Sequence, residues 1–198
     1  MALKRSASLG VCSALFLSGC ALFGGSTPLD TYDLSTPSSV AAARRSHHLQ
    51  ILVAEPAAIK SFDGQNIVIK PSPGVIEYLK GAQWADRLPK VVQARLIDAL
   101  QRSGRFAGVG KPGEGLAIDY QVITDIRAFD IVASGTAHAE VSLFVRLLND
   151  RNGAVKTQKL FTADAPVIGT GNGAFVKALD RAFDKAASDI VSWSASVL

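Results

Sequence analysis

Two segments in the second half of the chain alternate between apolar and polar residues, and together with a third predicted strand they constrain the fold more than any other feature. Residues 116–127 show it first, residues 139–147 repeat it after Ser134-Gly135, and residues 154–163 follow a turn at 149–153. Alternation with a period of two places one set of side chains on one face of a strand. The segments therefore predict an antiparallel meander, joined by hairpin turns and buried on its apolar face.

Two other segments follow the spacing of three and four that places apolar residues along one stripe of a helix. The first begins near Leu88, with Asp86 as its predicted N-cap, and ends at Gly104. The second extends from Phe175 to Trp193, with Asn172 predicted to cap its start. Each helix therefore has one apolar stripe to bury.

Short β-branched runs at 49–54, 66–70 and 75–79 predict further strands in the first half of the chain. The combination predicts an α/β (α+β) fold: a two-layer sandwich in which a mostly antiparallel or mixed sheet carries two amphipathic helices on one face. The other face of the sheet is half polar in pattern. An uncovered face or edge of the sheet is therefore a candidate contact surface.

The N-terminus has the parts of a bacterial export signal. Lys4 and Arg5 precede an apolar run at 9–17, which is much shorter than the roughly 20 residues that cross a bilayer. Leu17-Ser18-Gly19-Cys20 then resembles a lipobox. We predict a signal peptide at 1–19 and lipidation of Cys20, through which the chain is anchored to a membrane. The alternative is an ordinary signal peptide that ends near a cysteine by chance.

The predicted mature chain divides into two parts. Residues 20–45 are rich in Gly, Ser, Thr and Pro, and are predicted to be a lipidated N-terminus and flexible tether, in which 31–34 has the pattern of a short edge strand. Residues 46–198 are predicted to be one folded domain. The second cysteine, Cys12, lies within the signal, so no disulfide is expected within the mature chain.

No constellation of residues predicts catalysis. The loop at 169–173 is rich in glycine but lacks the Gly-Lys-Ser/Thr of a phosphate-binding loop, so a loop leading into a helix is the simpler interpretation. His47 and His48 are neighbours that point to opposite faces of a strand, and His138 has no further ligand at a suitable spacing. We therefore predict no catalytic residue, no metal site and no cofactor, and hence a protein that is not an enzyme.

Charge gives no indication of a nucleic-acid partner. The chain has 21 Lys and Arg against 17 Asp and Glu, and two of the basic residues lie in the predicted signal. Trp84 and Tyr78 are the candidate partner-binding residues, because Trp and Tyr are frequent at interface hot spots. For Trp84 the alternative is an aromatic side chain that closes one end of the core.

The order of several short motifs resembles the ABC-type transport auxiliary lipoprotein family, including its PqiC-like branch. After the lipobox come, in order, Tyr32-Asp33-Leu34, Ile67-Val68-Ile69-Lys70, Ile76-Glu77-Tyr78, Trp84-Ala85-Asp86-Arg87-Leu88, the helix ending at Arg102-Ser103-Gly104-Arg105-Phe106, and the closing helix. Where that family usually has an arginine and a glutamate, this chain has Lys70 and Asp86. The resemblance extends from about Thr31 to Trp193.

This resemblance implies a non-catalytic component of a lipid or hydrophobic-solute transport system. Its partners would be an ABC-type permease and ATPase and a substrate-binding protein of the mammalian-cell-entry (MCE) class, which the lipoprotein would dock at the outer membrane. Ala21, which follows the lipidated cysteine, favours the outer over the inner membrane by resemblance to known sorting rules. The alternative function is an envelope-assembly or integrity lipoprotein that binds outer-membrane proteins or polysaccharide.

Overall fold

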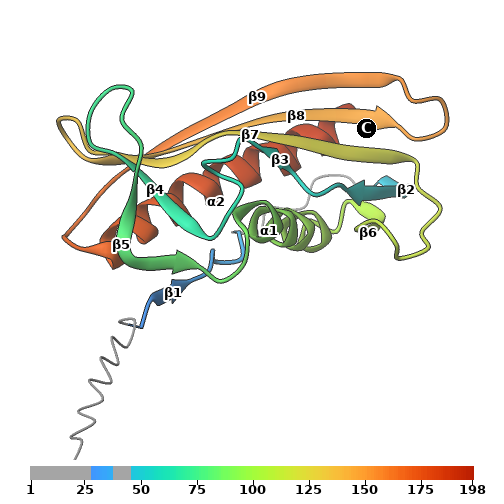
Figure 1. The fold of residues 1–198 in the computed structure, drawn as a ribbon. Helices are drawn as coiled ribbons and strands as arrows, with labels where there is room; N and C mark the ends of the chain where they lie inside the picture. The colour runs from blue at the N-terminus through green and yellow to red at the C-terminus, as the bar shows by residue number, and fades with distance from the viewer. Residues whose placement is uncertain (1–27, 38–45) are drawn as a thin grey trace, which may run out of the picture.

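The computed structural model describes residues 28–37 and 46–198, which form one nine-stranded sheet and two helices. Both helices lie on the same side of the sheet, so the molecule has two layers (Figure 1). The strands are β1 (Asp30–Tyr32), β2 (Ser46–Val53), β3 (Ala57–Ala58), β4 (Asn66–Lys70), β5 (Glu77–Trp84), β6 (Phe106–Gly110), β7 (Tyr120–Val132), β8 (His138–Asn149) and β9 (Val155–Pro166). The helices are α1 (Leu88–Arg102) and α2 (Asn172–Val197).

Strand β7 is the centre of the sheet. One of its edges pairs with β8 in antiparallel register from Tyr120↔Asn149 to Val132↔His138, and β8 pairs in turn with β9. Its other edge receives β2, β3 and β4 one after another, each parallel to it. The sheet is therefore mixed, and both the predicted fold class and the predicted meander are confirmed.

Outside this centre the sheet continues with short strands. β6 lies parallel to β2, β5 lies antiparallel to β4, and β1 lies parallel to β5 at the margin. Within β5 the chain turns at Gly81, whose φ of +73° lies in the left-handed region that favours glycine. The predicted strand at 75–79 is thus longer than expected, because this turn lets it continue to Trp84.

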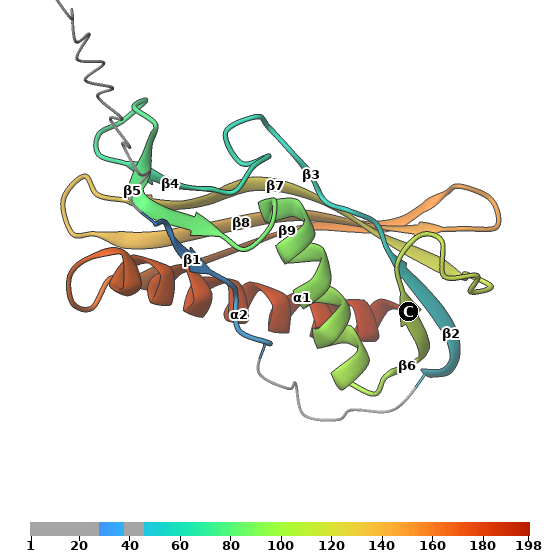
Figure 2. The ribbon, with the colours of Figure 1, turned by 60° about the horizontal axis from the view of Figure 1, so that its bottom comes forward.

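The core lies between the sheet and the two helices. Phe129 on β7 is near its middle, with the ring centroids of Trp84 and Phe183 at 5.8 Å and 6.0 Å. Alternate residues of β8 are fully buried from Ala139 to Leu147, as the sequence pattern predicted. Helix α2 buries its stripe beneath β8 and β9, and α1 packs beside it (Figure 2).

The helices begin differently from the prediction. The N-cap of α1 is Arg87 and not Asp86, whose carboxylate instead accepts a hydrogen bond of 2.7 Å from the backbone N–H of Arg87. The N-cap of α2 is Gly171, and the side-chain amide of Asn172 donates to the carbonyl of Lys80 at 2.9 Å. Both predicted caps were therefore wrong, because each side chain finds another backbone partner.

Part of the segment predicted to be a tether, residues 20–45, is folded, and β1 lies where the short edge strand at 31–34 was predicted. Strand β1 pairs with β5, and Leu34 is only 2% exposed within the core. The backbone N–H of Ser35 donates to Asp180 on α2 at 2.7 Å, and Asp33 forms an ion pair with Arg95 on α1. Residues 28–37 thus belong to the folded unit because they bring apolar side chains to its margin, whereas 20–27 and 38–45 lie outside the described residues.

Candidate functional site at the open sheet edge

Strand β9 is an open edge of the sheet. Among the described residues it pairs with β8 alone, over 12 residues from Val155 to Pro166. The chain passes from β9 directly into the connection to α2 (Figure 1), so no later strand among the described residues covers this edge. Unpaired backbone N–H and C=O groups along such an edge can accept an extended segment of another protein.

The ends of this edge carry residues that discourage unwanted pairing. Lys156 and Lys159 occupy one end, and Pro166, which has no N–H to donate, closes the other. Between them lie residues 160–165, in which Phe161 and Ala163 face the core while the Leu160 side chain is exposed. At about 3.3 Å per residue, these six residues make an edge of about 20 Å, which is long enough to hold a short peptide strand.

A groove follows the same edge on its helix side. It is a hollow of about 620 Å³ between β9 and the last turns of α2, lined by Lys159, Leu160, Phe161, Thr162, Asp189, Ser192, Trp193 and Ser196. The aromatic surface of the groove is the partly exposed Trp193, whose ring meets that of the buried Phe161 edge to face at 5.3 Å. A chain added to β9 would thus find both backbone partners and an aromatic surface for its inward side chains.

Trp84 is part of the core. It is only 1% exposed and lies at the end of β5, with its ring perpendicular to that of Phe129. Its backbone N–H donates to the carbonyl of Gln65 at 2.7 Å. Of the two interpretations that the sequence left open, the structure therefore shows the aromatic residue that closes the core, and Trp84 offers no surface to a partner.

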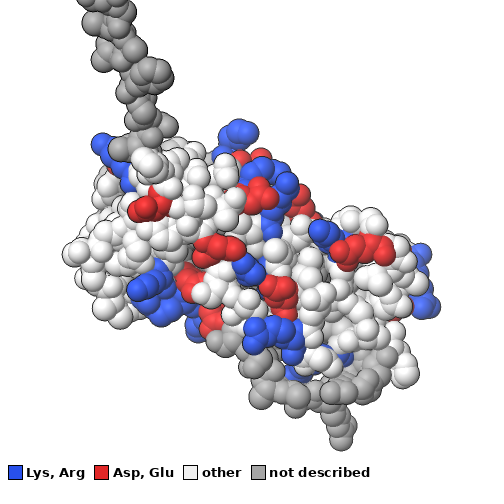
Figure 3. Space-filling model, turned by 90° about the horizontal axis from the view of Figure 1, so that it is seen from below, with Lys and Arg blue, Asp and Glu red and all other residues white. Residues whose placement is uncertain are grey.

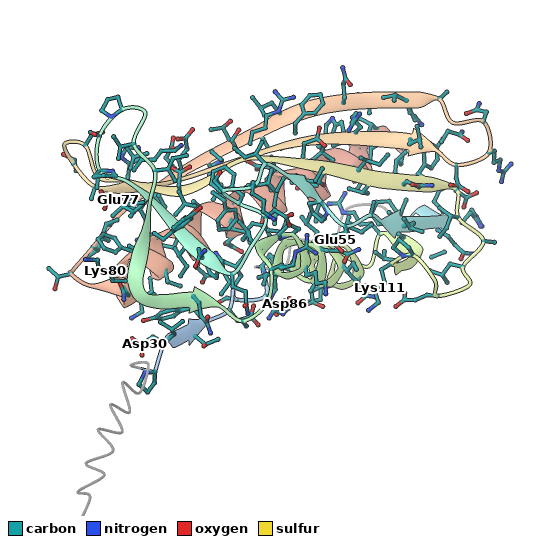
Figure 4. The ribbon with its side chains drawn as sticks, viewed as in Figure 1. Asp30, Glu55, Glu77, Lys80, Asp86 and Lys111 are labelled. Atoms are coloured by element: carbon teal, nitrogen blue, oxygen red, sulfur yellow. The ribbon has the colours of Figure 1, made fainter. Side chains whose placement is uncertain are left out.

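Tyr78 is exposed and lies away from the Trp84 ring. Its side chain is 45% exposed on the first half of β5, where its partner across the strands is Val68 of β4. The turn at Gly81 separates it from the half of β5 that carries Trp84, and Lys80 marks this bend in Figure 4. The structure does not bring these two predicted site residues together, but it leaves Tyr78 available for contact.

Lys70 and Asp86 have structural contacts in this fold. The Lys70 ammonium lies 2.7 Å from the carboxylate of Asp130, which is fully buried on β7. Asp86 contacts the start of α1 through the backbone of Arg87 and lies 3.8 Å from the ammonium of Lys90. Each residue thus has a role in the fold that requires no external ligand.

A second open hollow lies over α1. It has a volume of about 490 Å³, and its lining includes Glu55, Asp86 and Lys111 (Figure 4). Acidic and basic side chains are mixed across the face seen from the helix side, without a large patch of one sign (Figure 3). This surface has no electrostatic preference strong enough to nominate a charged ligand, in contrast to the backbone and aromatic groups of the β9 edge.

Comparison with known proteins connects this fold to a family. Residues 32–191 match the model of the ABC-type transport auxiliary lipoprotein component, which spans most of the chain. The chain belongs to this family. The resemblance predicted from the order of short motifs is thereby confirmed for this auxiliary component.

Individual proteins resemble this chain in sequence or in fold. An uncharacterised protein of Bradyrhizobium diazoefficiens is 31% identical in an alignment of 176 residues that covers 86% of this chain and 47% of the relative. The chain thus spans about half the length of that curated relative. A crystal structure of a Xanthomonas campestris protein superposes with a TM-score of 0.77 at 24% identity, covering 84% of this chain and 95% of that one.

A second solved structure, of an uncharacterised protein, has a TM-score of 0.68 at 15% identity. The superposition covers 85% of this chain and 99% of that one. At such identities these two likenesses establish a shared fold. They show that the sandwich with two helices on one face recurs in proteins of widely different sequence.

The predicted lipidation site, Cys20, lies outside the described residues, because it precedes the first of them. Within 28–37 and 46–198 no group of three His, Cys, Asp or Glu side chains is arranged to hold a metal ion. No helix in those ranges is long and apolar enough to cross a membrane.

Proposed function

We propose that this chain is an outer-membrane-anchored periplasmic lipoprotein that docks the substrate-binding protein of an ABC/MCE-type lipid or hydrophobic-solute transport system. Membership of the auxiliary family supports a role beside an ABC transporter. In this proposal Cys20 carries the lipid, and the folded domain binds and does not catalyse.

The open edge of β9 is the observation that carries the docking role. A partner segment paired with residues 160–165 would satisfy backbone groups that are unpaired in the described chain. The Phe161 and Trp193 pair lies beside this edge, so the same segment would also bury apolar side chains. An extended terminal segment of an MCE-class substrate-binding protein is the occupant that we propose.

Ser192→Arg tests this surface. Ser192 is an exposed residue of α2 that lines the groove, so an arginine there would fill the groove without disturbing the core. We expect affinity for the proposed MCE-class substrate-binding protein to fall at least about tenfold, or 1.4 kcal/mol. Isothermal titration with the two purified proteins measures the loss.

Ala94→Arg is the matched control. Ala94 is an exposed residue of α1 that lines the other hollow, so this variant adds the same side chain to a helix at a distance from β9. Equal binding by the parent chain, Ser192→Arg and Ala94→Arg would remove the β9 groove from the docking surface. Failure of the parent chain to bind any MCE-class protein, together with an unchanged outer-membrane lipid balance on deletion, would contradict the proposed function itself.

A further inference from the structure

Exposed apolar side chains gather at one end of the molecule. Five of the nine large hydrophobic residues that are exposed in the described chain lie on connections at this end or beside it: Leu29, Val75, Ile76, Tyr78 and Ile168. We call these five residues the apolar end. The connections from β4 to β5 and from β9 to α2 and the start of β1 all lie on the left in Figures 1 and 2.

The strand register confirms that these connections share an end. Val132, the last residue of β7, pairs with His138, which pairs with Pro166 just before Ile168. Ile131 pairs with Ile69 of β4, which pairs with Glu77 beside Ile76. The hydrogen bond from Asn172 to Lys80 joins the start of α2 to the bend of β5, next to which β1 begins at Asp30↔Ala82.

The length of chain ahead of β1 limits what this end can face. Nine residue steps separate Cys20 from Leu29, and they reach at most about 30 Å when fully extended. β7 has 13 residues, so at about 3.3 Å each the sheet is roughly 40 Å long. A lipid on Cys20 therefore keeps Leu29 within about 30 Å of the membrane, which excludes an upright orientation with Val155 at the membrane and the apolar end about 40 Å away from it.

The side chains of the apolar end suit the boundary between headgroups and acyl chains. Aliphatic residues on narrow connections can enter this boundary without moving the sheet, and a tyrosine favours it because its ring is apolar and its hydroxyl is polar. Lys80 can extend its ammonium to lipid phosphate. Asp30 and Glu77 lie at the same end (Figure 4), which restricts the contact to a shallow one.

We infer that the apolar end is a membrane-contact surface, which rests on phospholipid and fixes the orientation of the domain on its anchor. The inference rests on the proposed function only for the lipid at Cys20. It places the long axis of the sheet away from the membrane, so that the β9 edge is presented sideways to a partner in the periplasm.

A fluorescent probe at single introduced cysteines tests this orientation. Acylated Cys20 has no free thiol and Cys12 leaves with the signal, so Ile76→Cys or Ile168→Cys would carry the only label. Val155→Cys at the far end is the matched control, because Val155 is 49% exposed and Ile76 is 47% exposed. The full acylated chain is reconstituted in vesicles of phosphatidylethanolamine and phosphatidylglycerol, with a spin-labelled lipid as quencher.

We expect several-fold stronger quenching at positions 76 and 168 than at 155, with a blue-shifted emission at the first two. Equal and weak quenching at all three positions, on a chain whose acylation is verified by mass spectrometry, overturns the inference and leaves the proposed function intact. Shielding at 76 and 168 that appears only when the substrate-binding protein is added identifies a protein contact and overturns it as well. If mass spectrometry shows no acyl group on Cys20, the lipid anchor is absent, and both the proposed function and the inferred orientation are contradicted.

Discussion

The pair formed by Lys70 and Asp130 shows how one residue can connect a strand to the centre of the sheet. Asp130 is fully buried on β7, and the ammonium of Lys70, which remains 31% exposed, lies 2.7 Å from it. Removal of one member of such a pair leaves a charge without compensation in the protein interior. The sequence showed Lys70 only as a departure from the family pattern, because a cross-strand partner is separated from it by 60 positions.

Lys70→Met should therefore lower the free energy of unfolding by about 3 kcal/mol, near the lower limit for breaking a buried pair because Lys70 keeps some contact with water. Urea unfolding followed by circular dichroism measures this change. The double variant Lys70→Met/Asp130→Leu should recover much of the loss, since no buried charge then remains. If the single and double variants are equally unstable, packing and not charge is the contribution of Lys70.

At the scale of elements, an ion-pair cluster connects the loop after β3 to the start of α1. The Arg87 guanidinium, at the N-cap of α1, donates to Asp63 in this loop and lies 3.0 Å from the carboxylate of Glu55. The hydrogen bond from Arg87 lowers the pKa of Asp63 below its ordinary value, and the same contact raises the pKa of Arg87. The loop is thus held by charge as well as by its backbone.

Acid should loosen this loop before it unfolds the domain. The folded-state pKa of Asp63 is lowered, so its contribution is present above the ordinary carboxyl pKa of about 4 and is lost as the pH falls through the folded value. Nuclear magnetic resonance shifts of residues 60–65, titrated from neutral pH downward, should report this transition. Asp63→Asn should abolish it, and a transition that persists in this variant would assign it to another group.

Patterns that extend over many residues predicted their elements, whereas the short strands β3 and β6 had no pattern of their own. The meander and both helices follow from patterns that extend over nine or more residues, where alternation or helical spacing is unambiguous. β6 lies in a glycine-rich stretch for which the sequence predicted no strand, and β3 has only two residues. Strands of this kind form because β2 and β7 offer them an edge, which is a tertiary cause that no local pattern contains.

The whole molecule differs from its prediction chiefly at the N-terminal margin. The composition of residues 20–45 indicated a tether, yet β1 and Leu34 are packed into the fold. The composition of a segment is an average over all its residues. One buried leucine and three residues paired with β5 are nevertheless enough to attach this segment to the folded domain. The open edge at β9 was foreseen in general terms, but which edge stays open follows from the order of strands in the sheet.

Leu34→Ala should therefore cost about 3 kcal/mol of unfolding free energy, as expected when a buried leucine is truncated. Leu29→Ala, five positions earlier and half exposed, should change stability by less than about 0.5 kcal/mol. Thermal and urea unfolding of the two variants compare them directly. Equal stabilities would mean that the segment around β1 is held only weakly.

The position of β1 also determines how the domain bears mechanical load. A pull along the axis of β1 loads the hydrogen bonds of three residues aligned parallel to β5 together, whereas a pull across that axis opens them one at a time. Behind them, buried Leu34 and the ion pair between Asp33 and Arg95 pass the strain to α1. A force applied at the N-terminal side would therefore detach β1 and Leu34 before it loads the hydrogen bonds of the meander.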